Sequence, residues 1–298
     1  MDKVVLALES AKSQAKEIAE IIRKNHRIIN PEIANKIENC VNYLPISFSA
    51  NGNKKYKPFI CGSSLCPVCH LFKLRKELAL TAQMFHKISK NPFYIDHHYC
   101  FFTFTLKDCQ ISDVKDVINH LKTSFTNFNR RKQWKSNVVG WSQFFHFGLN
   151  PFGKVQPHIH VLGLVKPGHS LQLYELKETW SDLLSVDYLP EVSFQALLNQ
   201  NVNEVMSTFA YGYNMIDHKS AIKEDSTYCE LMKIIRLETS SEIRCRSHHG
   251  VFKKERLNIN QEWKNKSIDE DEMTVIMKYS NDHYYQDRMI QSQFIETI

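Results

Sequence analysis

The segment from Val138 to Val165 constrains the fold most, because two strand-like runs flank a tight turn. Residues 138–149 are rich in aromatic and β-branched residues, and residues 157–165 are almost entirely apolar apart from their histidines. Such runs favour extended chain. Between them, Asn150-Pro-Phe-Gly-Lys154 has the residue types of a turn. The sequence therefore predicts an antiparallel hairpin.

The elements around this hairpin predict an α+β fold. Strands are also expected at residues 99–106 and 191–196, and helices at residues 1–39, 72–90, 112–132, 171–186 and from about 203. The order strand, helix, strand, strand, helix, strand, helix is typical of a split βαβ arrangement, a central antiparallel sheet covered by helices on one face. Residues 40–70 are expected to be loop. The last 40 residues are expected to be a peripheral helical appendage, with the acidic run at 269–272 on a solvated face.

Three domains follow from this pattern: 1–90, 91–258 and 259–298. The 298 residues, 43% of them hydrophobic, can build a sizeable core, and 9 Gly and 9 Pro predict no long flexible tract. The net charge of +6 suits a polyanionic partner. Neither a secretory signal nor an apolar run of membrane-spanning length is recognised, so we expect a cytoplasmic protein that has no membrane partner and keeps its 8 Cys reduced.

Three histidines of the hairpin are candidate metal ligands. His158 and His160 flank apolar Ile159, so on a strand their side chains point to the same face. His146 lies on the preceding strand and comes opposite this pair if the turn closes near residues 151–154. Neutral imidazoles bind divalent cations well, and three converging histidines leave coordination positions open for substrate and water. The alternative is an exposed polar face of the sheet.

A second candidate metal site consists of cysteines. Cys61, Cys66 and Cys69 have the spacing of zinc ligands around a tight Cys-Pro-Val-Cys turn. Cys40 is our first choice for the fourth ligand and His70 the second. Such a site would be structural, whereas the alternative is a group of buried free cysteines. The remaining cysteines, which are scattered and expected to be unliganded, are Cys100, Cys109, Cys229 and Cys245.

The segment from Phe125 to Lys135 interleaves basic and aromatic residues. Basic side chains neutralise phosphates, and flat rings stack on unpaired bases. A second basic stretch, Lys73, Arg75 and Lys76, follows the cysteines. Ordinary solvated helix faces are the alternative for both stretches. The candidate nucleic-acid contacts are Arg130, Arg131, Lys132, Trp134 and Lys135.

These motifs together resemble the replication initiators of rolling-circle plasmids, within the HUH endonucleases (His, hydrophobic, His). The matching pieces occur in the family's order over residues 61–254, and they are the Cys66–Cys69 knuckle, the strand Phe101–Leu106, the strand Gly140–Asn150, the His158–His160 pair and Gly250–Lys253. Two departures are present. His146 stands where the family commonly has Glu, which shifts metal preference toward softer ions, and Ser207–Tyr211 lacks the Glu and Lys of the family's Glu-x-x-Lys-Tyr segment.

The resemblance implies an activity and a set of partners. His146, His158 and His160 would hold Mg²⁺ or Mn²⁺, and the cysteines would hold structural Zn²⁺. A tyrosine would nick single-stranded plasmid origin DNA sequence-specifically and rejoin it through a 5′-phosphotyrosine intermediate, leaving a 3′-OH for the host helicase and polymerase machinery.

Helical periodicity distinguishes two candidates for the nucleophile. Tyr213 continues an apolar stripe with Val205 and Phe209, whereas Tyr211 falls on the polar side with Ser207. A nucleophile must meet DNA, so Tyr211 is preferred and Tyr213 is the alternate.

Other functions remain open at this point. An HUH transposase or relaxase would use the same chemistry, although no candidate tyrosine lies near the N-terminus as a relaxase usually requires. A non-enzymatic zinc-knuckle DNA-binding protein would need only the cysteines. A nucleotide hydrolase of the histidine-triad type needs a further histidine two residues after His160, where this chain has Leu162.

Overall fold

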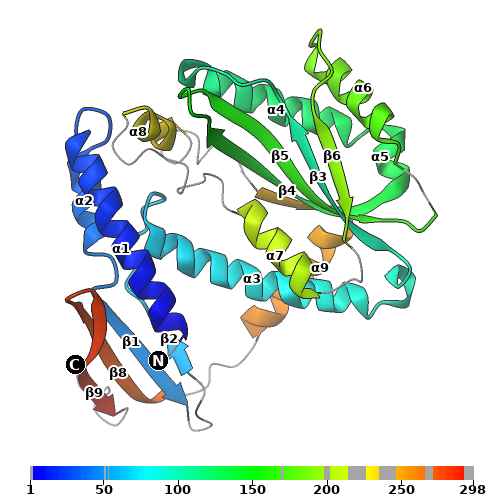
Figure 1. Ribbon diagram of the computed structural model, residues 1–298. Coiled ribbons are helices and arrows are strands. Elements are labelled where there is room, and N and C mark those ends of the chain that lie inside the picture. Colours follow the sequence, from blue (N-terminus) through cyan, green and yellow to red (C-terminus); the bar gives the residue numbers. More distant parts are fainter. Residues whose placement is uncertain are drawn as a thin grey trace. The chain divides into compact units, whose positions relative to one another are not determined.

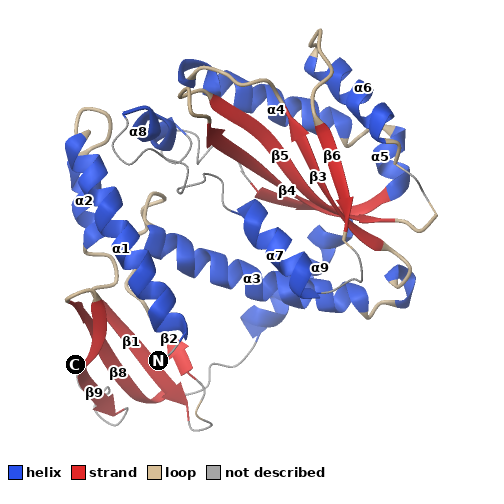
Figure 2. Cartoon of the chain, in the orientation of Figure 1, coloured by secondary structure: helices blue, strands red, loops and turns tan. Residues whose placement is uncertain are grey.

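The chain forms an α+β structure, as its sequence predicts (Figure 2). The computed structural model describes residues 3–49, 52, 54–168, 171–197, 202–213, 226–234, 246–265 and 271–291. Two compact units are present: a terminal unit made of Met1–Lys73 and Asn265–Ile298, and a central unit made of Leu74–Lys264. The boundary between these units, near residue 73, falls inside the helix Pro67–Ser89.

The central unit is built on a five-stranded antiparallel sheet with the order β6-β3-β5-β4-β7. The predicted hairpin is confirmed as β4 and β5, which pair from Val138↔Val165 to Leu149↔Val155. The strands are β3 His98–Thr105, β4 Val138–Leu149, β5 Val155–Val165, β6 Val192–Ala196 and β7 Arg246–His249.

Helices cover both faces of this sheet, so the expectation of one covered face was wrong. Figure 1 shows α4, α5 and α6 on one side and α3, α7 and α9 on the other. The reason lies in β3 and β5, which carry buried apolar residues at both odd and even positions. Their apolar side chains therefore point to both faces of the sheet, and both faces need cover. The helices are α3 Pro67–Ser89, α4 Val114–Phe128, α5 Lys132–Asn137, α6 Leu173–Leu184, α7 Val202–Tyr213, α8 Ser226–Met232 and α9 Gly250–Asn265.

The layer between the sheet and α4, α5 and α6 is aromatic. The ring of Phe104 lies 5.4 Å from that of Phe125, 4.8 Å from Phe128 and 5.4 Å from Trp180, centroid to centroid. Trp134 of α5 completes the cluster at 5.2 Å from Phe102 and is fully buried. Edge-on packing of large rings stabilises this layer beyond the area that it buries.

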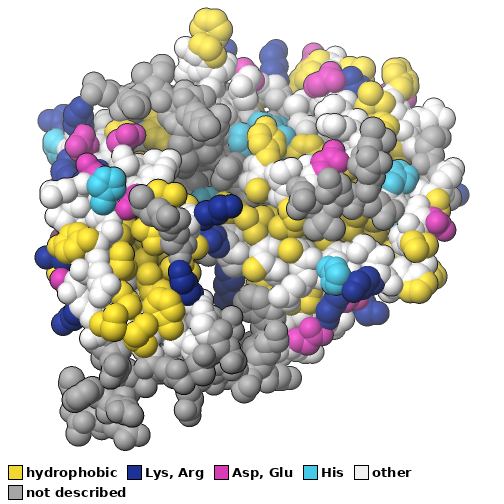
Figure 3. Space-filling model, turned by 60° about the horizontal axis from the view of Figure 1, so that its bottom comes forward, with side chains coloured by type: hydrophobic (Ala, Val, Ile, Leu, Met, Phe, Trp, Pro, Cys, Tyr) yellow, Lys and Arg dark blue, Asp and Glu magenta, His cyan; other side chains and the backbone are white. Residues whose placement is uncertain are grey.

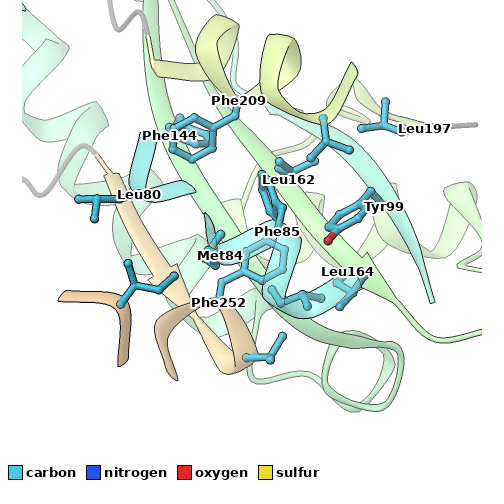
Figure 4. Packing of buried hydrophobic residues seen from close by; sticks show 14 residues of the cluster. Leu80, Met84, Phe85, Tyr99, Phe144, Leu162, Leu164, Leu197, Phe209 and Phe252 are labelled. Atoms are coloured by element: carbon cyan, nitrogen blue, oxygen red, sulfur yellow. The ribbon is translucent and has the colours of Figure 1, made fainter. Parts of the chain in front are cut away.

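The opposite layer holds a core cluster of buried hydrophobic residues from the sheet and from α3, α7 and α9 (Figure 4). Phe85 of α3 contacts Tyr99, Phe209 and Phe252 edge-on or nearly so, with ring centroids 5.3, 6.5 and 5.5 Å apart. Phe209 of α7 also packs on Phe144 of β4 at 5.1 Å. This packing anchors α7 against the sheet.

Two glycines allow the backbone of β4 to approach the start of α9. Gly140 and Gly250 form an antiparallel bridge. A Cβ on Gly250, which has a φ of +57°, would lie 2.1 Å from the carbonyl oxygen of Val139, and a Cβ on Gly140 would lie 2.5 Å from Val251 Cγ1. Both positions therefore require glycine.

The terminal unit contains α1 Lys3–Lys24, α2 Pro31–Glu38 and a second antiparallel sheet. The sheet has the order β2-β1-β8-β9 and is formed by β1 Tyr43–Ser49, β2 Lys54–Tyr56, β8 Asp271–Ser280 and β9 His283–Gln291. Among the described residues, none of the helices in either unit is both long and apolar enough for a membrane crossing.

This second sheet corrects two expectations. Residues 43–49 and 54–56 are strands within the expected loop, and residues 271–291 form a hairpin where a helical appendage was expected. The cause is long-range pairing: β8 pairs with β1, and Ser47 Oγ lies 3.0 Å from Thr274 Oγ1 across 227 positions of sequence. Half of the acidic run, residues 269 and 270, lies outside the described residues.

Candidate functional site

Strand register brings the three predicted histidines together. His146 of β4 lies directly opposite His158 of β5, and His160 follows two residues later on the same face. Their ring centroids are 4.6 Å (His146–His158), 5.5 Å (His146–His160) and 4.6 Å (His158–His160) apart. One nitrogen of each ring lies within 4.8 Å of one nitrogen of each of the others. This spacing is compatible with one shared metal ion.

Hydrogen bonds at the Nδ1 atoms leave the Nε2 atoms of two histidines for a ligand. His158 Nδ1 donates to the carbonyl oxygen of Gln156 at 3.1 Å, and His160 Nδ1 lies 3.1 Å from Thr103 Oγ1. His160 Nε2 is buried and has no hydrogen-bond partner among the described residues. A buried nitrogen without a partner is costly, and a bound cation would satisfy it. The residues present therefore fit a metal ion.

Burial favours the neutral form of two of these imidazoles, His158 and His160, and the neutral form is the one that binds metals. Burial lowers the pKa of His158. Burial, followed by the charges of His158 and His146, lowers the pKa of His160 to about 3. Both pKa values fall because the site is low in polarity, and removing a cationic ring from water is unfavourable.

Helix α7 places Tyr211 beside this cluster. The ring centroid of Tyr211 lies 5.2 Å from that of His160 and 6.3 Å from that of His146, and 56% of the residue is exposed. Val205 and Phe209 on the same helix are buried, as the helical periodicity predicts. Tyr213 ends the helix, and its side chain lies outside the described residues.

Two further residues line the site and were not singled out from the sequence. Phe101 of β3 stacks on His160 with ring centroids 5.0 Å apart and meets the edge of Tyr211 at 6.3 Å. Thr103 is the register partner of His160. The sequence marked this strand, but the register between β3 and β5, which decides the neighbours of His160, has no local signal.

The four predicted cysteines also come together, in the terminal unit. Cys40, Cys61, Cys66 and Cys69 each place Sγ within 4.8 Å of the others. Cys69 Sγ lies 3.7 Å from Cys40 Sγ and 3.5 Å from Cys61 Sγ. Sulfurs surrounding a zinc ion at about 2.3 Å lie about 3.8 Å apart at the corners of a tetrahedron. The cluster therefore fits a four-sulfur zinc site, with Cys40 rather than His70 completing it.

The backbone around Cys40 is held in an uncommon conformation. Val41 is buried at a φ of 55°, which is unfavourable for a β-branched residue. The buried Lys12 of α1 donates to the carbonyl oxygens of Glu38 (2.7 Å) and Cys40 (3.0 Å), and to Asn42 Oδ1 (2.7 Å). Lys12 thus ties α1 to the loop that presents Cys40.

The basic side chains of α5 and of the turn before it are exposed, whereas the aromatic residue among them is buried. Trp134 is fully buried in the aromatic layer, so its predicted role in stacking on bases was wrong. On the face that Figure 3 shows, the coloured Lys and Arg side chains are scattered rather than gathered into one large patch. The exposed basic residues of the segment are Arg130, Arg131, Lys132 and Lys135.

These features define an α+β protein with two candidate metal centres, an open one of three histidines beside an exposed tyrosine and a closed one of four cysteines. Residues 52–291 match the family model described as "Replication protein". The chain belongs to this replication protein family. The resemblance to rolling-circle plasmid initiators that the sequence motifs indicated is thereby confirmed.

Curated relatives agree with this assignment. The chain is 26% identical over 172 residues to Protein rep of Streptococcus pneumoniae serotype 2 (strain D39 / NCTC 7466), covering 54% of this chain and 53% of the relative. It is 23% identical over 184 residues to Protein rep of Lentilactobacillus hilgardii, covering 57% and 56%. It is 24% identical over 214 residues to Protein rep of Staphylococcus aureus, covering 67% and 89%. The chain thus spans about half the length of the first two. No solved structure matched it.

Proposed function

We propose that this chain initiates rolling-circle replication of a plasmid by nicking one strand of the origin and joining the 5′ end to Tyr211. The observation that carries this proposal is the position of Tyr211, whose exposed ring lies 5.2 Å from the ring of His160. A phenol beside a cluster of metal-binding imidazoles is suited to attack a phosphodiester. The proposal rests on this geometry and on the family assignment.

The chemical step transfers one phosphoryl group. After losing its proton, the phenol oxygen of Tyr211 attacks the scissile phosphorus, and the bond from phosphorus to the 3′ oxygen breaks. The 3′ oxygen takes up a proton and leaves as a hydroxyl, while the 5′ phosphate stays on the tyrosine. Because one phosphoester replaces another, the strand can be rejoined by the reverse step without an added energy source.

His146, His158 and His160 would hold the divalent cation. When bound, the cation supplies Lewis-acid polarisation of the scissile phosphate and neutralises charge that develops there. Three nitrogen ligands favour Mn²⁺ over Mg²⁺, which prefers an all-oxygen environment. Thr103 orients the His160 ring, and Phe101 covers one side of it.

The cysteine cluster is proposed to hold structural Zn²⁺. Four sulfur ligands complete a tetrahedron and leave no position for substrate. Cys40, Cys66 and Cys69 are buried, in keeping with a site that stabilises the fold rather than one that performs chemistry.

Contacts with DNA are proposed for the basic residues of α5 and the turn before it. Arg130, Arg131, Lys132 and Lys135 are exposed and can neutralise phosphates without reading sequence. The 3′-OH released by nicking requires a polymerase to extend it and a helicase to open the duplex ahead. These host proteins, in the cytoplasm, are the expected further partners.

The test is formation of a covalent protein–DNA adduct on single-stranded origin DNA with Mn²⁺. The wild-type protein should give a shifted band on a denaturing gel, and peptide mapping should place the DNA on Tyr211. Tyr211→Phe should bind DNA but give no adduct. Tyr174→Phe is the matched control, since Tyr174 is 63% exposed on α6, away from the histidine face of the sheet.

The alternate nucleophile is tested in the same gel. Tyr213→Phe should retain the adduct. An adduct with Tyr211→Phe and none with Tyr213→Phe would transfer the role to Tyr213, and no adduct with the wild-type protein would reject the proposed activity.

A further inference from the structure

The tip of the β4–β5 hairpin presents one aromatic ring to solvent. Phe152 is 87% exposed, more than any other large hydrophobic side chain in the described ranges. The same hairpin carries all three histidines of the candidate metal centre. An exposed large ring at this place is informative because the surrounding hairpin is otherwise well packed.

The distance from the tip to the histidines follows from the strand register. His146 pairs with His158, and Leu149 pairs with Val155 three positions later, where the strands end. At about 3.3 Å per residue, the turn that holds Phe152 begins about 10 Å beyond the histidine pair. A DNA strand whose phosphate lies at the histidines can therefore reach the tip.

The turn is ordered by its own hydrogen bonds. Asn150 Oδ1 accepts from the backbone nitrogens of Phe152 and Lys154, both at 2.9 Å. The backbone nitrogen of Asn150 donates to the carbonyl oxygen of Lys154 at 2.9 Å. The backbone nitrogen of Gly153, whose φ is 72°, donates to the carbonyl oxygen of Asn150 at 3.0 Å. The backbone that carries the exposed ring is thus held in a closed turn.

A contact outside the hairpin ties the turn to the rest of the central unit. Asn150 Nδ2 donates to Asp108 Oδ2 at 2.7 Å, and Cys109 exchanges two backbone hydrogen bonds of 2.9 Å with Val155. The position of the tip relative to the sheet is therefore fixed, so a base stacked there would also have a fixed position.

The surroundings of Phe152 favour a nucleic acid over a protein partner. Lys154, two positions after Phe152 on the same turn, is exposed. A single ring next to a lysine provides too little apolar area for a protein interface, whereas stacking on an unpaired base requires one ring and nearby positive charge.

We infer that Phe152 is a stacking site for one unpaired base of the DNA strand that passes the histidine centre. The inference deepens the proposed function and rests on it for the identity of the strand. Because the turn is ordered, the stacked base sets which phosphate lies beside Tyr211. Phe152 is thereby a positioning residue and takes no part in the chemistry.

The first test uses a single-stranded dT oligonucleotide with one 2-aminopurine, whose fluorescence changes on stacking. It is carried out with Tyr211→Phe protein, so that no cleavage interferes. Removing the ring by Phe152→Ala should weaken binding about 10-fold and abolish the change in fluorescence. Phe152→Trp should preserve both. Phe93→Ala is the matched control, since Phe93 is 77% exposed in the same unit, and it should bind as its parent does.

A second test uses origin DNA and active protein. Phe152→Ala should raise KM more than it lowers kcat and should spread cleavage over neighbouring phosphates, because the strand is no longer held in register. The Phe152→Trp variant should cleave at the wild-type position.

The outcomes separate the two claims. Unchanged affinity and fluorescence with Phe152→Ala would overturn the stacking site, even if the wild-type protein nicks DNA. Absence of an adduct with the wild-type protein would overturn the proposed function, while fluorescence on the dT probe would still report stacking. Unchanged DNA binding together with a loss of self-association in sedimentation would assign Phe152 to a contact between copies of the chain and overturn the inference.

Discussion

Thr103 Oγ1 lies 3.1 Å from His160 Nδ1, across directly opposed positions of β3 and β5. A hydroxyl at this place can accept a hydrogen bond from Nδ1 and orient the ring so that Nε2 is left for the metal. Neighbours of this kind commonly change metal affinity by a factor of about 10–100.

The first prediction concerns this contact. Thr103→Val keeps the shape of the side chain and removes the hydroxyl, so Mn²⁺ affinity should fall about 10-fold. Thr103→Ser, which keeps the hydroxyl, should bind nearly as the wild type does. Titration with Mn²⁺ followed by electron paramagnetic resonance measures both, and equal affinity in the valine variant would contradict the role of Thr103.

Removal of two histidines should abolish nicking without unfolding the protein. His158→Ala with His160→Ala removes two of three ligands, and neither side chain belongs to the central hydrophobic cluster. Adduct formation should disappear while the circular dichroism spectrum is retained. His86→Ala, at an exposed position of α3, is the control and should stay active. Retained cleavage by the double variant would disprove the metal site.

Loss of one cysteine should remove zinc and destabilise the chain. Cys66→Ser is expected to release the ion and lower the Tm by about 10 °C, since a structural site contributes several kcal/mol and each kcal/mol shifts Tm about 2–4 °C in a chain of this size. Cys109→Ser should keep zinc, because Cys109 lies outside the cluster. Elemental analysis of the purified wild-type protein tests whether the cysteine cluster holds zinc, and protein without zinc would rule out the site.

Glycine at position 250 should be essential for stability. Gly250→Ala places a Cβ 2.1 Å from the Val139 carbonyl oxygen at a φ of +57°, so the backbone must shift, and we expect a loss of about 3 kcal/mol or more. Gly168→Ala is the control, because its φ is +70° and nothing lies within 4 Å of the added Cβ. It should cost about 1 kcal/mol. Equal losses in urea unfolding would show that the close approach of β4 and α9 is unimportant.

The basic residues of α5 should act through charge alone. Lys135→Ala should weaken binding of single-stranded DNA of any sequence and reduce the slope of log K against log salt by about 0.7. Trp134→Phe, by contrast, should lower the free energy of unfolding and leave this slope unchanged, because Trp134 is buried. A salt slope that Lys135→Ala does not alter would exclude Lys135 from the interface.

Features that depend on neighbouring residues could be predicted from the sequence. The β4–β5 hairpin, the shared face of His158 and His160, and the outward position of Tyr211 all follow from the two-residue repeat of a strand or the 3.6-residue repeat of a helix. The cysteine cluster was also predictable, because three of its members lie within nine residues and zinc sites have characteristic spacings.

Features that depend on distant residues were decided only by the tertiary structure. The burial of Trp134 is one example. Rings among basic residues occur both on DNA-binding surfaces and at the edges of cores, and only the packing of Trp134 against Phe102 shows that this ring belongs to the core. The pairing of Ser47 with Thr274 is another, since no local pattern indicates which of two distant strands will meet.

The sequence by itself thus determined which side chains share a face of one element, because backbone geometry repeats over a few residues. Only the tertiary structure decided which faces meet. It placed Thr103 on His160, Tyr211 over the histidines and Cys40 beside Cys69, because strand register and helix docking depend on the burial of the whole core and on no single segment.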